Sequence, residues 1–184
     1  MILHRCFAWN RTASPGAPDT AAWFPRAFQG DGRHDNPDTY GCLYLSDRPV
    51  SCVAEQFAAF RGQRLVASLL RRRGLPLAVA DLELDADAAL VDLDEPATLR
   101  RERLRPSAVA TRERKTTQPQ ARALYHRHPD AAGLKWWSMW EAQWANVTLF
   151  DRAADALKVV AVRALTLDDP VVVEAGDLFG LRRA

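Results

Sequence analysis

The chain has 184 residues, long enough for one domain with a substantial core and too short for two comfortable ones, so we predict a single domain over residues 1–184. Lys and Arg number 25 against 23 Asp and Glu, a formal net charge of +2, and this balance gives no reason to expect direct binding of nucleic acid. No stretch approaches the roughly 20 apolar residues of a membrane span, and the N-terminus MILHRCFAWN lacks the long apolar run of a signal peptide, so we predict a cytoplasmic protein without membrane contact.

The first half of the chain begins with two strands separated by a long loop. ILHRCFAW has alternating, β-favouring residues and predicts a strand at about residues 2–9. Residues 10–39 are rich in Pro and Gly, which predicts a loop with one helical turn near 21–28. Loops of this length in a compact domain are usually functional or disordered. YGCLYLSD then predicts the second strand.

A helix is predicted over about residues 49–61, and it contains one acid in an apolar setting. Ser46 or Asp47 is placed to cap the helix, and its first turn tolerates a proline. The apolar residues follow helical spacing, and Glu55 in VAEQF falls beside that stripe rather than opposite it. Taken alone, this pattern is typical of an exposed helix acid.

The second half of the chain mixes strands and helices. LAVADLEL and ALVDLDE predict two short strands, and residues 96–128 are polar, Arg-rich and mostly helical. The runs RRERLRP and TRERK in that region are most simply a solvated face. GLKWWS and ANVTLFDR predict strands, and the β-branched run LKVVAVRAL suits a central strand. Strands at both ends of the chain with helices between them predict an α+β fold.

Several familiar chemistries lack their motif in this sequence. The motifs GxGxxG, GxxxxGK[ST], HExxH and GxSxG are all missing. The sequence therefore gives no support to a dinucleotide-binding fold, a P-loop protein, a zincin or a serine hydrolase. Cys6, Cys42 and Cys52 lie in apolar contexts without metal or redox spacing, so we expect buried thiols. His126 and His128 favour the end of a surface helix over metal binding. We therefore expect no metal site.

What remains is a set of single polar residues embedded in apolar strands and helices: Arg5, Arg33, Tyr44, Glu55 and Ser138. In GRHDNPDTYGCLYLSDRPVSCVAEQF, and again in GLKWWS followed by NVTLF, the sequence resembles the RES domain family, named for its Arg, Glu and Ser. Arg33, Tyr44, Glu55 and Ser138 match the family's marked positions in the right order. The sequence departs from the pattern at HD after Gly-Arg, where an aromatic residue often stands, and in the bulky segment WWSMWEAQW.

The resemblance implies a fold similar to ADP-ribosyltransferases, with mixed or antiparallel sheets around an NAD cleft and flanking helices. It also implies the toxin of a bacterial toxin–antitoxin pair. That toxin destroys NAD+ at the nicotinamide–ribose bond, by phosphorolysis or hydrolysis. The expected partners are NAD+ as substrate, phosphate as a candidate co-substrate, and a cognate antitoxin with a helix-turn-helix domain. No cofactor is expected, and the sequence leaves open whether the chain forms a homo-oligomer.

The residue types suit that reaction. Glu55 in a dry cleft would stabilise the positive charge that builds on the ribose when the N-glycosidic bond breaks. Arg33, with Arg5 as a further candidate, suits the pyrophosphate because a planar guanidinium grips two oxygens at once. Tyr44 offers a ring to stack on nicotinamide, and Ser138 a hydroxyl for the amide or ribose. We accordingly assign Glu55, Arg33 and Tyr44 to catalysis, and Arg5, Arg33, Tyr44 and Ser138 to substrate binding.

Two alternatives stay open. One is a catalytically silent module that binds a nucleotide or a protein. The other is an ADP-ribosyltransferase that modifies a macromolecule, because water, phosphate and protein acceptors all attack the same face of the sugar. On the residues alone, Tyr44 and Ser138 are also compatible with ordinary strand positions, and Arg5 with a structural ion pair.

Overall fold

The computed structural model describes residues 1–183 and divides the chain into two compact units. Unit 1 comprises Met1, Phe24–Leu45 and Leu84–Leu157. Unit 2 comprises Ile2–Trp23, Ser46–Glu83 and the described residues from Lys158 onward. Because each unit is assembled from separate stretches of the chain, no linker composition marks a boundary in the sequence. The single domain expected over residues 1–184 stays a prediction.

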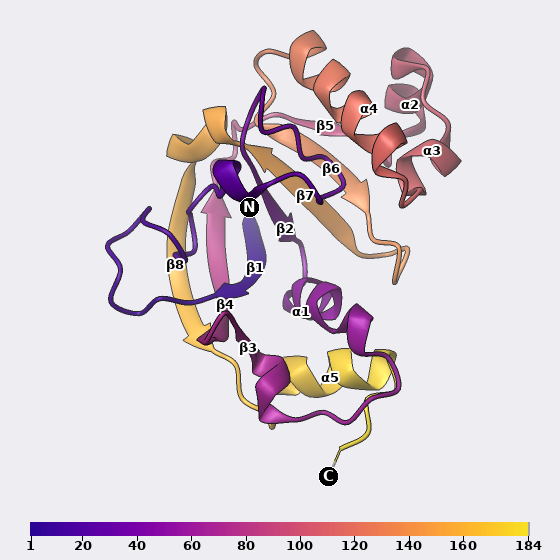
Figure 1. Cartoon of the computed structure of the whole chain (residues 1–184). Helices are drawn as coiled ribbons and strands as arrows, with labels where there is room; N and C mark the ends of the chain where they lie inside the picture. Colours follow the sequence, from indigo (N-terminus) through magenta and orange to yellow (C-terminus); the bar gives the residue numbers. More distant parts are fainter. Residues whose placement is uncertain (184) are drawn as a thin grey trace. The chain divides into compact units, whose positions relative to one another are not determined.

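The strands of unit 1 form a mixed sheet section in the order β2-β7-β6-β5 (Figure 1). These strands are β2 (Cys42–Ser46), β5 (Leu90–Asp92), β6 (Gly133–Trp137) and β7 (Ala145–Phe150). β5 and β6 run parallel, whereas β6 and β7 are antiparallel, with Gly133 opposite Leu149 and Trp137 opposite Ala145. A Cβ atom at Gly133 would meet the backbone oxygen of Thr148, so only glycine fits at this close pairing.

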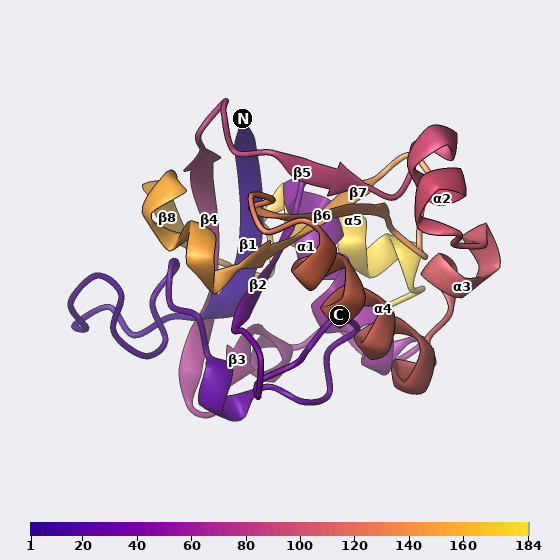
Figure 2. The same cartoon turned by 90° about the horizontal axis from the view of Figure 1, so that it is seen from above.

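Three α-helices of unit 1 lie beside one another in Figures 1 and 2. They are α2 (Pro96–Glu102), α3 (Pro106–Ala110) and α4 (Arg114–Arg127), and 3₁₀ turns η1 (Arg26–Phe28) and η4 (Asp151–Ala156) complete the unit. α2 and α3 each begin with a proline, whose fixed φ suits the first helical position. The helices pack on the strands through one apolar cluster, which includes Leu99, Val109, Leu124, Leu134 and Phe150.

Unit 2 is built on the long antiparallel pair of β1 and β4. β1 (Ile2–Ala8) pairs with β4 (Leu75–Leu84) from Ile2 opposite Glu83 to Ala8 opposite Leu77. The short strand β3 (Arg71–Arg72) and the longer strand β8 (Leu157–Ala164) also pair with β4. The remaining elements are helices α1 (Pro49–Phe57) and α5 (Pro170–Leu178) and the 3₁₀ turns η2 (Ala58–Phe60) and η3 (Ala67–Leu70).

Helix α1 is positioned by its apolar face. Val50, Val53, Ala54 and Phe57 are buried, and the helix packs against α5 and β1. These residues recur at helical spacing, so burying them orients the whole helix and determines which residues face outward.

The predicted α+β class is confirmed, and most predicted elements occur where the sequence placed them. The expected helical turn near 21–28 is present only as η1. The three cysteines are buried free thiols, and burial raises the pKa of Cys6 to about 12. Within residues 1–183, no helix combines the length and apolar character that crossing a membrane requires.

Two predictions of local structure are wrong. The N-cap of α1 is Arg48, without a side-chain cap, because the Ser46 hydroxyl donates instead to the backbone oxygen of Arg48. β8 is not a central strand: in the described part of the chain it pairs with β4 alone, and residues 158–161 are exposed. β-Branched residues favour an extended backbone, but burial depends on what covers the strand, which composition does not encode.

Candidate functional site

The five predicted site residues are divided between the two units. Arg33, Tyr44 and Ser138 belong to unit 1, whereas Arg5 and Glu55 belong to unit 2. In unit 1 the loop before β2 carries the Gly-Arg motif, and its geometry is set by a buried carboxylate.

That carboxylate is Asp35, which is 5% exposed. Its Oδ2 accepts hydrogen bonds from the backbone N–H groups of Gly30 (2.8 Å) and Gly32 (2.7 Å). Its Oδ1 accepts from the hydroxyl of Tyr44 at 2.7 Å. A buried carboxylate with three such donors compensates the loss of its hydration, so Asp35 ties the loop to strand β2.

Gly32 is the residue that allows this arrangement. A Cβ atom at this position would collide with the Asp35 carboxylate and with the Tyr44 hydroxyl. The glycine of the Gly-Arg pair is therefore required by space, since any side chain would separate Asp35 from Tyr44.

The Tyr44 hydroxyl makes two hydrogen bonds, one as donor and one as acceptor. It donates to Asp35 and accepts from the backbone N–H of His34 at 2.9 Å. Burial, with Cys42 and Asp35 nearby, raises the pKa of Tyr44 well above its ordinary value of 10, so the phenol stays neutral. The ring is partly buried and packs at the margin of the unit 1 core.

Arg33 is buried, at 7% exposure, and anchored by the protein itself. Its Nη1 donates to the carbonyl oxygens of Val109 in α3 (2.8 Å) and of Thr111, the residue that follows α3 (2.5 Å). The guanidinium lies over the ring of Trp136, 4.6 Å from its centroid, and Nη2 approaches the sulfur of Met139 at 3.9 Å. These contacts hold a permanent positive charge in a fixed orientation.

His34 forms a second buried contact of the loop. Its Nδ1 lies 2.8 Å from the Thr148 hydroxyl, which also accepts from the indole N–H of Trp136 at 3.1 Å. Because the indole can only donate, the hydroxyl hydrogen of Thr148 is available to a neutral His34. Burial, followed by the charges of Arg33 and Arg114, lowers the pKa of His34 from 6.5 to about 3.

Helix α4 holds the backbone of the same loop. The Thr117 hydroxyl donates to the carbonyl of Arg33 at 2.6 Å. The amide of Gln118 donates to the carbonyls of Gly30 (2.8 Å) and Gly32 (2.9 Å). Backbone groups of an irregular loop need such partners when they leave water, so α4 and the Gly-Arg loop form one ordered substructure.

Ser138 lies at the start of the β6–β7 connection and is 2% exposed. Its hydroxyl accepts from the backbone N–H of Trp140 at 3.1 Å, and its own N–H donates to the carbonyl of Trp144 at 2.7 Å. The serine therefore shapes the aromatic hairpin that carries Met139 toward Arg33.

In unit 2, Arg5 is engaged by the loop that follows β1. Its Nη1 lies within hydrogen-bond distance of three carbonyls, those of Thr20 (3.1 Å), Ala21 (2.6 Å) and Trp23 (3.3 Å). Burial lowers the pKa of Arg5 from 12.5 to about 10, which leaves the side chain cationic near neutral pH. Arg5 therefore holds the loop after β1 through backbone carbonyls, whereas the structural alternative from the sequence was an ion pair.

Glu55 is exposed on α1, and its neighbours Val53, Ala54 and Phe57 are buried. The expected dry cleft does not surround Glu55 in this structure, because the apolar face of α1 turns toward α5 and β1 and leaves the carboxylate outside. The helix therefore presents Glu55 at the surface of unit 2 from a firmly packed backbone.

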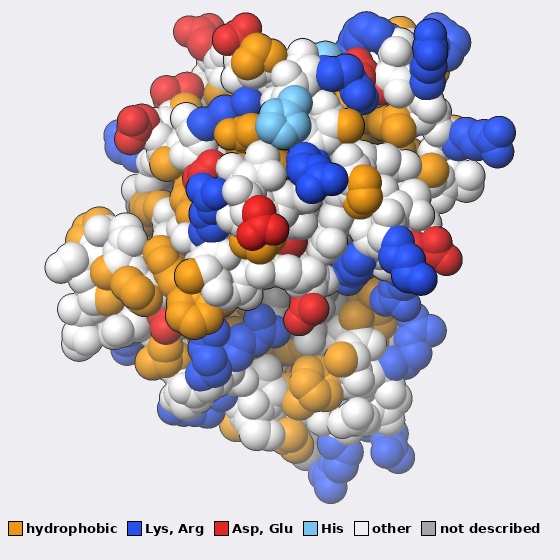
Figure 3. Space-filling model, turned by 45° about the horizontal axis from the view of Figure 1, so that its top comes forward, with side chains coloured by type: hydrophobic (Ala, Val, Ile, Leu, Met, Phe, Trp, Pro, Cys, Tyr) orange, Lys and Arg blue, Asp and Glu red, His pale blue; other side chains and the backbone are white. Residues whose placement is uncertain are grey.

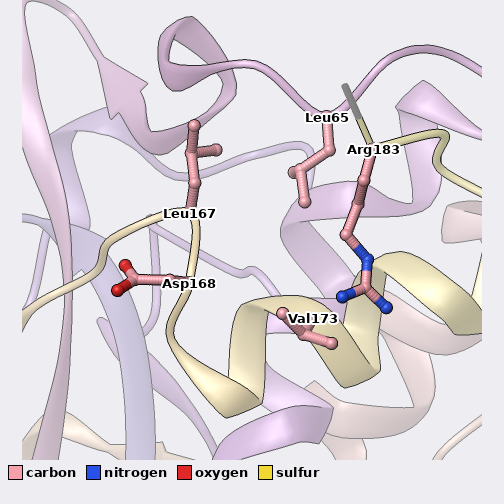
Figure 4. A pocket seen from close by; sticks show the side chains of 5 residues that line it. All are labelled: Leu65, Leu167, Asp168, Val173 and Arg183. Atoms are coloured by element: carbon pink, nitrogen blue, oxygen red, sulfur yellow. The ribbon is translucent and has the colours of Figure 1, made fainter.

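Unit 2 also contains a hollow of about 390 Å³ (Figure 4). It is lined by Leu65, Leu167, Asp168, Val173 and Arg183, and none of the predicted site residues borders it. Figure 4 shows Val173 on α5, with Arg183 and Asp168 on opposite sides of it. Over residues 1–183, no group of three His, Cys, Asp or Glu side chains is arranged to hold a metal ion.

Comparisons with known proteins concern the family and the fold of the chain. The model of the RES domain matches residues 3–169. A chain of the crystal structure of the M. tuberculosis MbcT–MbcA toxin–antitoxin complex is similar in fold, with a TM-score of 0.63 and 17% identity. The similarity covers 96% of this chain and 87% of that one. Comparison with curated proteins finds no match.

Sequence reasoning missed Asp35, His34, Thr148 and Trp136 as parts of the Arg33 surroundings. His34 and Asp35 stand out only as departures from the family pattern, and that departure was the available signal. Thr148 and Trp136 read as ordinary strand residues, since their contacts with the loop arise only in the folded chain.

We expect Asp35→Asn to lower the free energy of unfolding by about 2 kcal/mol, because its NH₂ group would face donors that need an acceptor. Tyr44→Phe should lower the free energy of unfolding by about 1 kcal/mol. The double variant should lose less than the sum, since both single variants break the same Tyr44–Asp35 bond. Urea denaturation measures all three, with Asp38→Asn, an exposed acid of the same loop, as the control. An Asp35→Asn effect as small as that of Asp38→Asn would contradict the anchoring role.

The lowered pKa of His34 predicts a loss of stability in acid. Between pH 6.5 and about 3 the unfolded chain binds a proton at His34 that the folded chain does not, so stability falls as pH decreases through this window. The slope from this residue approaches about 1.4 kcal/mol per pH unit. His34→Gln should lack that slope, so the difference in the free energy of unfolding between the two proteins should change with pH across this window, as measured by denaturation at several pH values. A pH-independent difference would show that the pKa of His34 is the same in the folded and unfolded chain, against the lowered value.

Proposed function

Since this chain belongs to the RES domain family, we propose that it cleaves NAD+ at the nicotinamide–ribose bond and acts as the toxin of a toxin–antitoxin pair. One resemblance carries the proposal: Arg33, Tyr44, Glu55 and Ser138 match the marked positions of the RES family in order. All four lie within the residues 3–169 that the family model matches. The motif, rather than a measured distance, assigns residues of both units to one reaction. The similar fold of a chain from a toxin–antitoxin complex supports the biological role.

Glu55 is the proposed catalytic carboxylate. Cleavage of the N-glycosidic bond builds an oxocarbenium-like charge on the ribose, and nicotinamide leaves readily from its cationic ring. One carboxylate is therefore sufficient for the chemistry. Because Glu55 is exposed, its field is screened by water until substrate covers it, and its stabilisation of the cation grows when bound NAD+ excludes that water.

Arg33 is proposed to supply a fixed positive charge for the pyrophosphate. Its Nη1 is already engaged by the carbonyls of Val109 and Thr111, so those bonds orient the guanidinium before substrate arrives. A charge oriented in advance costs no reorganisation during the reaction.

Tyr44 is proposed to contribute its ring rather than its hydroxyl. The hydroxyl is held by Asp35 and His34, and the raised pKa of Tyr44 keeps it from serving as a base near neutral pH. An aromatic face remains suited to stacking against nicotinamide. Ser138 contributes by shaping the hairpin beside Arg33, in addition to any bond with substrate.

The proposed reaction needs no cofactor, and phosphate or water is the acceptor. Because NAD+ is a metabolite of the cytoplasm, we propose that the reaction takes place there. The proposed partner is a cognate antitoxin with a helix-turn-helix domain, as the family resemblance implies. Transfer to a macromolecule differs only in the acceptor, and a silent binding module differs only in lacking turnover.

The purified chain is expected to consume NAD+ and release nicotinamide, as followed by chromatography with and without phosphate. ADP-ribose 1″-phosphate would identify phosphorolysis, and ADP-ribose would identify hydrolysis. Glu55→Gln should lower kcat by about a hundredfold, since such a charge contributes roughly 3 kcal/mol to transition-state stabilisation. The control is Glu174→Gln, an exposed acid on α5, which should leave kcat unchanged.

Intact NAD+ after incubation with folded protein would favour the silent module. Labelled ADP-ribose on a macromolecule, with no soluble product, would favour the transferase. A near-normal kcat for Glu55→Gln would make the carboxylate structural and reject the mechanism.

The toxin role predicts growth arrest when the chain is expressed in bacteria without an antitoxin, because loss of NAD+ halts redox metabolism. Glu55→Ala should restore growth at an unchanged protein level, while Glu174→Ala should not. Cellular NAD+ and immunoblotting are measured together. Arrest by both variants at normal NAD+ would separate toxicity from NAD+ cleavage.

A further inference from the structure

Residues 96–128 carry a charge that differs sharply from the rest of the chain. This segment contains eight Arg and one Lys against two acids, Glu102 and Glu113, a formal net charge of +7. Since the whole chain carries +2, the other 151 residues carry −5. The small global charge therefore conceals a strongly basic segment in an otherwise acidic protein.

The structure places all nine cations at the surface of unit 1. They are Arg100, Arg101, Arg103, Arg105, Arg112, Arg114, Lys115, Arg122 and Arg127, and each is exposed. We call these nine residues the basic face. Figure 3 shows Lys and Arg side chains gathered at the upper right, over the region that Figure 1 labels α2 to α4.

Packing directs the cations of α4 outward. Thr117, Ala121 and Leu124 are buried at helical spacing. Lys115 and Arg122 are seven residues apart on the other side of the helix, and both are exposed. Since burial of one side of α4 directs the other to solvent, the two charges point away from the core.

Part of the basic face is rigidly held. The Arg114 side chain donates to the carbonyls of Asp31 (2.7 Å) and Arg112 (2.8 Å), and Arg112 lies 5.0 Å from the ring centroid of Trp140. Glu102 accepts from Arg101 and Arg127, and its side chain is largely buried. Glu102 therefore offsets one unit of charge at Arg101 and Arg127, which the net charge of +7 already includes.

We propose that the basic face binds the phosphate backbone of double-stranded DNA. An array of exposed cations with few acids is the electrostatic footprint of a phosphate-binding surface. Eight of the nine cations are Arg, whose planar fork matches phosphate oxygens in pairs. The contacts are to phosphate, so the binding does not depend on base sequence.

The apolar content of the segment favours DNA over an acidic protein. All of residues 96–128 are described, and none of their large hydrophobic side chains is exposed. A stable protein interface needs apolar or aromatic anchors at its centre, whereas phosphate contacts do not. An acidic protein would therefore find charge on this face without a core to bury.

The same observation favours duplex over single-stranded nucleic acid. Single strands are usually bound by aromatic rings on which bases stack. Tyr125, the only aromatic residue of the segment apart from its histidines, is instead stacked on Tyr40 at 4.6 Å and covered by Arg152 at 4.1 Å. Its ring is thus occupied by the core of unit 1.

This inference replaces the expectation of a merely solvated face and of no nucleic acid contact. The sequence contains two short basic runs, RRERLRP and TRERK, but does not show whether their side chains share one exposed surface. The structure adds Arg122 and Arg127 to the same unit, exposes all nine cations and buries the apolar residues between them. The proposal does not depend on NAD+ cleavage.

The test is fluorescence anisotropy of a labelled duplex of about 30 base pairs with the full chain, across a series of salt concentrations. Log affinity should fall linearly with log salt, with a slope of about −0.9 for each phosphate contacted. The triple variant Arg100→Glu/Lys115→Glu/Arg122→Glu should bind at least about tenfold more weakly, with a slope smaller in magnitude by about 2 to 3.

The matched control is Arg11→Glu/Arg64→Glu/Lys158→Glu, which changes the net charge equally at exposed positions of unit 2. It should bind within about twofold of the original chain. Circular dichroism and thermal unfolding check that both variants fold. If the Glu variant misfolds, the corresponding Gln variant and the salt slope of the unmodified chain carry the test.

Three outcomes would overturn the proposal. Equal losses in the two triple variants would mean that net charge, and not the basic face, governs binding. Tighter binding of single-stranded than duplex DNA would contradict the backbone assignment. Stronger binding of a poly-glutamate peptide of matched charge would identify an acidic protein as the partner.

Discussion

The Gly-Arg loop of unit 1 depends on one buried carboxylate. Asp35 accepts from two backbone N–H groups of the loop and from the Tyr44 hydroxyl, and these donors come from both sides of the motif arginine. A charge taken out of water persists only when such donors replace its hydration. The absence of a side chain at Gly32 follows from keeping those donors in place, and Arg33 and His34 extend from the backbone that Asp35 holds.

The family's residues therefore differ in what they contribute. Arg33, Tyr44 and Ser138 use polar atoms to build unit 1, and Arg5 uses its guanidinium to hold the loop after β1. Glu55 alone among the five is exposed on a packed helix. A reaction that develops positive charge needs a carboxylate that reaches substrate, and it benefits from surrounding groups that do not move. The division between anchored residues and one outward carboxylate fits that requirement.

The charged side chains are distributed unevenly over the chain. Nine cations gather on α2 to α4 and the connections between them, while the remainder of the chain is acidic, and neither fact shows in the formal charge of +2. Local fields act within about a Debye length of roughly 8 Å, so a partner that approaches these helices meets a basic surface regardless of the total. The proposed NAD+ cleavage and the proposed DNA contact of the basic face thus call for different ligands on one small protein.

The sequence alone determined the α+β class, the main strands, helix α1 and the four motif residues, because backbone preference and side-chain periodicity are local. Only the tertiary structure decided what those residues touch. Arg33 meets Val109 across 76 positions and His34 meets Thr148 across 114, and no local pattern relates residues so far apart. For the same reason β8 could be predicted as a strand but not as an exposed one. Burial is a property of what packs against an element, and the chain supplies that partner only when it folds.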